Sequence, residues 1–360
     1  MKVKLAIVCI ISVFIVSFAF KNRNTPPPLT PYYLEYDSMK MEKPVIPADN
    51  PLTVEGVALG RMLFYDPLLS VNNTQSCGSC HLQKYSFTDG KPLSIGALGD
   101  TLNRNSMPLI NLAWSHFFFW DGRIKSLEQL VFEPITNPKE MGETEKGVLK
   151  KLNAHPYYPL LFKRVFNTDK IEKGHVEKSI AQFLRTIISN GIHLPPEVLN
   201  TPPEGVTEQE FYYQNYQDTT LRGFYFRFAN MCGSCHRTEI YNDQVYMASN
   251  QVNPVDIKMK VPPLLNISYT APYMHDGRFN NLEQIAEHYH EHIAELHSLE
   301  NYRVKEAIPN LFIIEYDKKM ISKFFTSFND TNIIINKKWS NPFEEKEFSW
   351  KQVLTELQCE

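Results

Sequence analysis

The sequence predicts a mainly α-helical protein made of two similar, cytochrome-c-like helical domains in tandem. Short motifs recur at one constant spacing, and the segments between them carry apolar residues at helical intervals, with no convincing run of alternating strand residues. A length of 360 residues suits two domains, and 43% hydrophobic with 21% charged residues excludes a disordered chain. The net charge of −3 and the lack of a long Lys/Arg block argue against a nucleic-acid partner.

The N-terminal segment, positions 1–50, predicts export. Residues 1–20 combine two lysines with an apolar run, and Lys21 and Arg23 follow it. This pattern is typical of a signal peptide cleaved after Ala19. An uncleaved membrane anchor is the alternative, because the run approaches the roughly 17 residues that span a bilayer. Both interpretations put the body outside the cytoplasm, so we expect a periplasmic protein. Residues 21–50 are proline-rich and are predicted to form an extended tether rather than domain core.

The chain contains an internal repeat with a constant offset. The segment CGSCH begins at Cys77 and again at Cys232, which gives an offset of 232 − 77 = 155. PLIN and PLLN, and the two DGR segments with the LEQ that follows each, keep the same offset. We therefore predict domains over residues 51–195 and 205–330 and a C-terminal extension over 331–360. A helix over 176–189 closes the first domain, and prolines between positions 195 and 203 form the linker.

The repeated Cys-x-x-Cys-His motif predicts two covalently bound haem c groups. In an exported protein the two cysteines form thioethers with the porphyrin, and the adjacent histidine supplies the proximal axial nitrogen. The residues concerned are Cys77, Cys80 and His81 for the first haem, and Cys232, Cys235 and His236 for the second. A zinc site built from the four cysteines is the alternative, but it leaves both histidines without a role. A thioredoxin-like redox pair lacks its βαβ context.

Beyond these motifs, the sequence resembles the bacterial di-haem cytochrome c peroxidases and their MauG-type relatives. The similarity runs from about Gly56 to Tyr289, through segments that include LGRMLFYDP, RNSMPLIN, FWDGRIKSLEQ, EPITNPKEMG and APYMHDGRFNNLEQIAEHY. The resemblance implies one haem in each domain, with the first haem reacting with hydrogen peroxide and the second transferring electrons. It also implies a calcium ion between the domains, and a small soluble cytochrome c or copper protein as electron donor.

The resemblance assigns residues around the first haem. Many relatives carry a distal histidine at a fixed offset after the motif histidine. Counting that offset from His81 reaches Ala97, so we expect an iron that is open without prior activation. Glu140 matches the family's distal carboxylate, which moves a proton between the two oxygens of peroxide. Pro134 matches a proline on the open side, and Trp120 matches a tryptophan near the pocket.

The resemblance and the repeat together assign the second haem and the calcium ion. Tyr289 lies one repeat offset after Pro134, at a position that is a ligating tyrosine in MauG-type relatives. We predict ligation by His236 and Tyr289, with Met274 as the competing donor. For calcium, the resemblance implies the side chain of Asn105 and the backbone carbonyls of Thr270 and Pro272, because Ca²⁺ prefers oxygen ligands.

The predicted function is a di-haem peroxidase that reduces hydrogen peroxide to water. One alternative is a MauG-like oxidase that modifies side chains of a partner protein, which Ala97 and Tyr289 favour. The other is a di-haem electron-transfer cytochrome without catalysis. Cys359 is predicted to be a free thiol, and the sequence assigns no role to Trp339 or Trp350.

Overall fold

The computed structural model describes residues 27–38, 41–190, 258–291 and 315–359, together with residues 205–207, 210, 214, 224, 228, 236 and 246–248. These residues are mainly helical, which confirms the predicted fold class. The α-helices are α2 (Val54–Tyr65), α3 (Cys77–Cys80), α4 (Leu127–Thr136), α5 (Glu145–Ala154), α6 (Tyr158–Phe166), α7 (Lys173–Arg185), α10 (Leu282–Glu291), α13 (Glu315–Phe325), α14 (Thr331–Ile335) and α15 (Trp350–Glu356). Two short strands, β1 (Tyr246–Ala248) and β2 (Lys258–Lys260), pair antiparallel with Met247 opposite Met259.

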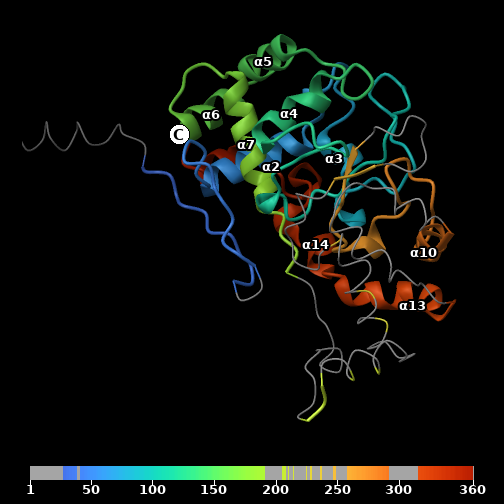
Figure 1. Ribbon diagram of the computed structural model, residues 1–360. Helices are drawn as coiled ribbons and strands as arrows, with labels where there is room; N and C mark the ends of the chain where they lie inside the picture. Colours follow the sequence, from blue (N-terminus) through green and yellow to red (C-terminus); the bar gives the residue numbers. More distant parts are fainter. Residues whose placement is uncertain are drawn as a thin grey trace, which may run out of the picture.

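The first unit, residues 51–190, is built on the contact between α2 and α7 (Figure 1). These helices approach so closely that a Cβ at Gly60 would clash with the backbone oxygen of Ser179. Leu63 and Phe183 are fully buried in this interface, where removal of apolar surface from water stabilises the pair. Thr53 begins α2, because its side chain accepts a hydrogen bond from the Gly56 N–H.

Helix α7 ends at Arg185, short of the end at position 189 predicted from the apolar pattern. The residues that follow remain buried, which explains the pattern, but their backbone bonds to another segment. Asn111 supplies the partners of these backbone groups. Its side-chain oxygen accepts from the Ser189 N–H at 2.7 Å, and its backbone N–H donates to the Ile187 carbonyl at 2.8 Å. The helix therefore gives way to a buried link with the loop around Asn111.

Both ends of the described chain pack on the first unit. Residues 27–38 and 41–50 are extended, as expected for a proline-rich segment, but they lie against the helices and Met41 is buried. Glu55 and Arg164 form a buried ion pair of 2.8 Å, and Arg164 also donates to the carbonyls of Pro27 and Leu357. One buried arginine thus joins the N-terminal segment to the C-terminal tail.

Segments related by the repeat offset have the same backbone. Helix α4 and helix α10 have equivalent bounds, and so do the 3₁₀ turns Leu112–Trp114 and Ile267–Tyr269. The bridge between Phe118 and Ile124 recurs between Tyr273 and Phe279. The αL residues Asn111, Phe119 and Gly122 recur as Asn266, Met274 and Gly277. We call the described residues of 205–330 the second unit.

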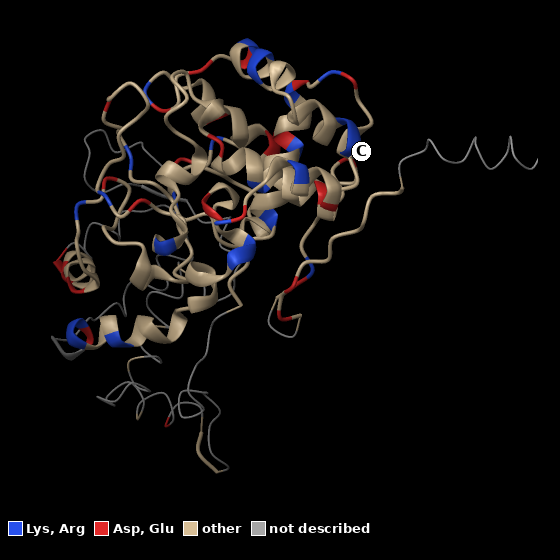
Figure 2. Ribbon diagram, turned by 180° about the vertical axis from the view of Figure 1, so that it is seen from behind, with Lys and Arg blue, Asp and Glu red and all other residues tan. Residues whose placement is uncertain are grey.

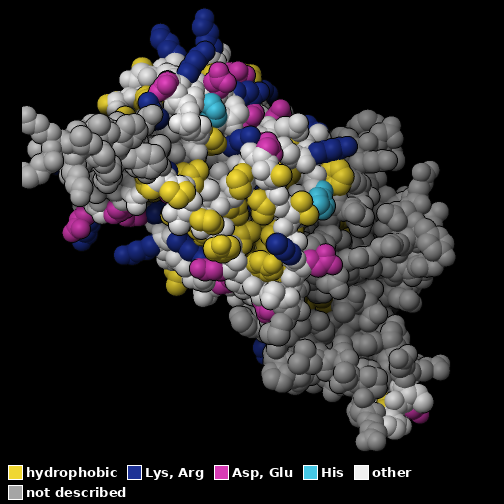
Figure 3. Space-filling view, turned by 90° about the vertical axis from the view of Figure 1, so that its left-hand side faces the viewer, with side chains coloured by type: hydrophobic (Ala, Val, Ile, Leu, Met, Phe, Trp, Pro, Cys, Tyr) yellow, Lys and Arg dark blue, Asp and Glu magenta, His cyan; other side chains and the backbone are white. Residues whose placement is uncertain are grey.

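Positions of Lys and Arg are interspersed with positions of Asp and Glu along the ribbon (Figure 2). On the side of the molecule where the C-terminus lies, hydrophobic side chains gather among charged ones (Figure 3). No helix in the described part of the chain is both long and apolar enough to cross a membrane. The predicted signal peptide or anchor lies outside that part.

Candidate haem sites

The first Cys-x-x-Cys-His motif forms one short helix and its cap. Cys77 and Cys80 are the ends of α3, and His81 is its C-cap, with its N–H bonded to the Cys77 carbonyl at 3.0 Å. A Cβ at Gly78 would lie 2.5 Å from the ring of Tyr65, so glycine lets this helix pack on α2. The structure therefore brings the three predicted residues together on one rigid turn.

The His81 ring is oriented by the backbone. Its Nδ1 lies 2.8 Å from the carbonyl oxygen of Phe87. A carbonyl only accepts, so Nδ1 carries the proton and the Nε2 lone pair is left to bind a metal. Ser86 and Phe87 both have positive φ, which turns the chain sharply back toward the ring. Burial lowers the pKa of His81, which keeps the imidazole neutral, as an iron ligand must be.

The two cysteine sulfurs of the first motif are uncharged thiols in this structure. Burial raises the pKa of Cys77 to about 12 and that of Cys80 to about 11. The alternative of a zinc site built from four cysteines also involves Cys232 and Cys235, which lie outside the described residues. Within the described ranges, no group of three or more His, Cys, Asp or Glu side chains can hold a metal ion.

Glu140 and Ala97 lie in two loops that touch each other. The Ala97 N–H donates to the Glu140 carbonyl at 2.7 Å, and a Cβ at Gly96 would clash with the Lys139 carbonyl. Burial raises the pKa of Glu140, although a hydrogen bond from Asn137 and the charge of Arg123 lower it in part. The charge of Glu140 also acts on both motif cysteines, which indicates that the carboxyl group is near the attachment helix.

Pro134 belongs to the same local structure. It lies inside α4, and its carbonyl accepts from the Met141 N–H at 3.1 Å. The end of α4 and the loop of Glu140 are thus joined by the backbone. The side chain of Pro134 has no donor atom, so it cannot ligate a haem iron.

The second motif is described only at His236, because Cys232 and Cys235 lie outside the described residues. The Nδ1 of His236 lies 2.9 Å from the Pro262 carbonyl, so its Nε2 is also left for a metal, and burial lowers its pKa. The Nδ1 of His81 likewise faces a backbone carbonyl, that of Phe87. The two histidines therefore share one kind of orienting contact.

A cavity of about 240 Å³ lies beside His236 and between the two units. We call it the second cavity, because it adjoins the histidine of the second motif. Tyr289 from α10 and Met274 both line it, so the structure offers both predicted donors without selecting one. Its walls are otherwise largely apolar, as suits a porphyrin, and include Val261, Leu264, Leu282, Ile285 and Phe325.

Trp120 lines this second cavity and connects the units. Its indole N–H donates to the Asn105 carbonyl at 2.9 Å, and its carbonyl accepts from the Lys260 N–H at 2.7 Å. Its ring lies 6.4 Å from the ring of His275, its own equivalent in the repeat. The sequence had indicated only a pocket beside the first haem, and it gave no sign of this position between the two units.

The three predicted calcium ligands line the same cavity as Trp120. Asn105 is buried, and its amide nitrogen donates to the carbonyls of Lys91 and Pro92, at 2.8 and 3.2 Å. These bonds fix the side chain. The backbone N–H of Asn105 donates to the His275 carbonyl of the second unit. Thr270 and Pro272 follow the 3₁₀ turn of that unit. The structure therefore places all three residues on the wall of one cavity, and the calcium site itself stays a prediction.

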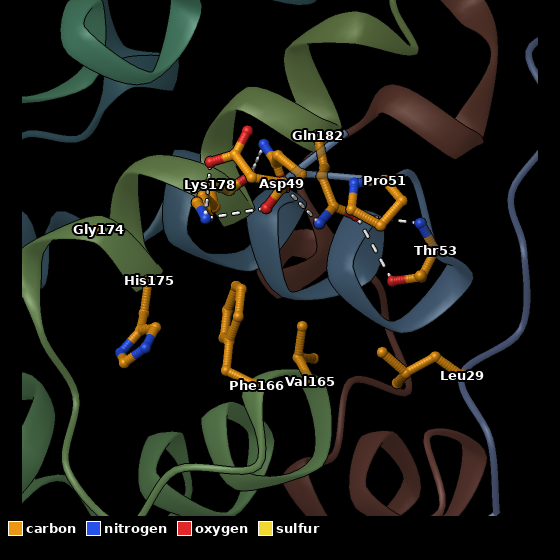
Figure 4. Close-up of a pocket in the computed structure, with 11 residues that line it drawn as sticks. Leu29, Asp49, Pro51, Thr53, Val165, Phe166, Gly174, His175, Lys178 and Gln182 are labelled. Carbon is orange, nitrogen blue, oxygen red and sulfur yellow. Dashed lines mark hydrogen bonds and ion pairs between the residues drawn. The ribbon is translucent and has the colours of Figure 1, made fainter. Parts of the chain in front are cut away.

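A separate cavity of about 300 Å³ lies between the N-terminal segment and the ends of α6 and α7 (Figure 4). Asp49 and Lys178 form an ion pair of 3.0 Å at its wall. No predicted haem or calcium residue lines this cavity, so we assign it no role in the chemistry.

Two units with oriented motif histidines, and a cavity between them, fit a c-type haem protein. Residues 54–193 match the family described as di-haem cytochrome c peroxidase. The chain is 33% identical over 260 residues to methylamine utilization protein MauG of Methylorubrum extorquens, covering 68% of this chain and 70% of that protein. It is 30% identical over 269 residues to cytochrome c551 peroxidase of Nitrosomonas europaea, covering 69% and 77%.

Among solved structures, a MauG-like protein associated with microbial copper homeostasis has the same fold. The TM-score is 0.66 at 24% identity, over 87% of this chain and all of that one. The protein belongs to the di-haem cytochrome c peroxidase and MauG family, as the sequence motifs predicted.

Proposed function

We propose that this protein is a di-haem c-type peroxidase that reduces hydrogen peroxide at the first unit. The observation that carries the proposal is an oriented His81 together with the Glu140 loop, against which the backbone of Ala97 packs. The family resemblance puts Ala97 at the position of a distal histidine in many relatives. Alanine has no donor atom, so this position would leave a bound haem iron open to peroxide. The cytochrome c peroxidases among the relatives support this reaction.

The haem, when bound through Cys77, Cys80 and His81, supplies an iron that coordinates and reduces peroxide. The protein's part is proton transfer. The Glu140 carboxylate accepts a proton from one peroxide oxygen and returns it to the other, so that the latter leaves as water. Partial burial raises the pKa of Glu140, which makes its protonated form a usable acid nearer to neutral pH. The complete reaction is H₂O₂ + 2 e⁻ + 2 H⁺ → 2 H₂O.

The second unit would receive electrons from a small soluble cytochrome c or copper protein. His236 and either Tyr289 or Met274 would hold the second haem through both axial positions, with Cys232 and Cys235 attaching it. Trp120 supports a route between the units, because it lines the second cavity and its carbonyl accepts from the Lys260 N–H of the second unit. A calcium ion held by Asn105, Thr270 and Pro272 would fix the spacing of the units.

The repeated backbone supports a tandem duplication with one haem in each unit. Helices α4 and α10, the two bridges and the αL residues recur at the offset of the motifs. A cross-connection supports it further, because Asn105 bonds to His275 while Lys260 bonds to Trp120, and the repeat relates Asn105 to Lys260 and Trp120 to His275. Together with the N-terminal apolar run, c-type haem attachment supports a periplasmic protein, either released or anchored by residues 1–20.

A MauG-like oxidase that modifies a partner protein is the second candidate. Ala97 and the position of Tyr289 in the second cavity favour it, as does the similarity to two MauG proteins. Both functions need the same open first site, and they differ in what supplies the electrons.

The test is turnover of the holoprotein with hydrogen peroxide and a reduced small cytochrome c. Rapid oxidation of the cytochrome, at one peroxide per two electrons, is expected for the peroxidase. A haem spectrum that changes with peroxide but stays unreduced by cytochrome would favour the oxidase. Two six-coordinate haems that ignore peroxide would establish an electron-transfer cytochrome and overturn the proposal.

A further inference from the structure

The C-terminal tail completes an aromatic cluster on the first unit. Trp350, the first residue of α15, stacks on Tyr157 with ring centroids 5.1 Å apart and meets Tyr158 edge-on at 5.3 Å. His155 lies 5.0 Å from Trp350 and 4.7 Å from Tyr158. We call these four residues the tail cluster. Tyr158 is fully buried, whereas Tyr157 and Trp350 are partly exposed, so the cluster runs from the core to the surface.

Tyr158 has a proton acceptor in place. Its phenol donates to a carboxylate oxygen of Asp66 at 2.5 Å, and its pKa is raised by burial and by the charge of Asp66. A phenol gives up a proton when it loses one electron. A carboxylate already hydrogen-bonded to that proton accepts it without any movement of the chain, which makes Tyr158 easier to oxidise than a buried tyrosine with no base.

Contacts connect Tyr158 to the first haem attachment. Asp66 follows Tyr65 in the chain, and the ring of Tyr65 packs against Gly78, between the two motif cysteines. Burial raises the pKa of the Tyr65 phenol well above its ordinary value. Each step from α3 to Tyr65, Asp66, Tyr158 and Trp350 is a covalent neighbour, a hydrogen bond or a ring contact.

We propose that the tail cluster is a second oxidation site, at which the oxidising equivalents of the first unit reach the surface and oxidise small electron-rich aromatic molecules. This inference rests on the proposed peroxide reduction. Tyr158 passes one electron toward the first haem site and its proton to Asp66. The stacked pair of Trp350 and Tyr157 then supplies an electron to Tyr158, and Asp66 returns the proton. A phenol at the surface then returns the electron and the proton, so that H₂O₂ + 2 ArOH gives 2 H₂O + 2 ArO•.

The exposed end suits such a reductant. Phenols and aryl amines stack on aromatic faces, and the Trp350–Tyr157 pair presents two such rings at the protein surface. Phe343 and Phe348 lie 6.0 and 5.5 Å from Trp350 and extend the apolar contact. A buried phenol needs a hydrogen-bond partner, and here that partner is the carboxylate of Asp66, which can also accept the phenol's proton.

The experiment is EPR of the holoprotein frozen rapidly after hydrogen peroxide is added. We expect a tyrosyl radical in the wild type, lost in Tyr158→Phe, which keeps the ring but removes the phenol. Asp66→Asn keeps an acceptor of similar shape but cannot take the proton, and it should lose the radical as well. Tyr36→Phe is the matched control, because Tyr36 pairs with Trp114 away from the tail cluster, and it should keep the radical.

The second measurement is turnover of guaiacol with peroxide, compared with turnover of reduced cytochrome c. Trp350→Phe should lower guaiacol oxidation severalfold and leave cytochrome oxidation unchanged. A radical that persists in Tyr158→Phe, or guaiacol oxidation unaffected by Trp350→Phe, overturns the inference while peroxide reduction stands. If peroxide does not alter the haem spectrum at all, the proposed function fails together with the inference.

Discussion

The two units hold their motif histidines in the same way and differ in the side chains that we propose to face each haem opposite the histidine. In both, Nδ1 bonds to a backbone carbonyl, which leaves Nε2 for iron. The first unit then offers Pro134, Ala97 and a carboxyl group, whereas the second offers a phenol and a thioether. The repeat thus preserves how each haem is held, and we infer that a few side chains opposite the histidines divide the labour between the units.

The largest expected effect comes from removing the carboxyl group of Glu140, because we assign no equivalent group to the second unit. Glu140→Gln should reduce peroxide turnover by about 10²–10⁴-fold, the usual contribution of general acid–base catalysis. Steady-state kinetics with a reduced cytochrome measures it. Glu133→Gln is the control, because Glu133 is an exposed carboxylate in α4, and it should change turnover little. Equal turnover in Glu140→Gln and the wild type would remove the chemical difference between the units.

The pH dependence of peroxide turnover should reflect the ionisation of the same carboxyl group. The base form of Glu140 is needed to take a proton from peroxide, and burial raises its pKa. Activity should therefore fall on acidification at a pH above the roughly 4.3 of an ordinary glutamate. The acid limb should disappear in Glu140→Gln, and an unchanged profile would assign it to another group.

Ala97→His is expected to make the first unit resemble the second. An imidazole at this position can bind the iron from the open side, so peroxide can react only after the imidazole has dissociated. If the open form falls to about 1%, the reaction with peroxide slows by about 100-fold. Stopped-flow spectroscopy measures the rate, and Ala97→Ser is the control of similar size. A rate unchanged in Ala97→His would mean that position 97 does not face the iron.

Tyr289→Phe should alter the second haem alone. Loss of a phenolate ligand should raise the reduction potential of that haem, on the order of 0.1 V within the ~0.8 V range that axial ligands span. Spectroelectrochemical titration measures it, with Met274→Leu as the matched variant. A shift in Met274→Leu and none in Tyr289→Phe would assign the ligand to Met274.

The smallest expected effect concerns the contact between the units. Chelation should lower activity a fewfold and added calcium should restore it, because the ion would join Asn105 to Thr270 and Pro272. Asn105→Ala should lower activity to a similar extent and remove the response to calcium. Full activity in chelator would separate the domain contact from any metal.

The helical class, the family and the motif turn of the first haem could be predicted because they depend on local spacing and on a repeated motif. The end of α7 could not, because Asn111, far away in sequence, takes the backbone bonds that would have continued the helix. The position of Trp120 between the units depends on a bond from the distant Lys260 N–H, which no local pattern contains. The sequence assigned no role to Trp350 because its ring partners, Tyr157 and Tyr158, lie far away in the sequence, at the start of α6.

The central claim is that one haem accepts peroxide while the other is closed by the protein. EPR of the fully oxidised holoprotein, recorded before and after one equivalent of hydrogen peroxide, tests it most directly. One high-spin and one low-spin signal are expected at first, with the high-spin signal lost on addition of peroxide. Two low-spin signals that both survive peroxide would contradict the account.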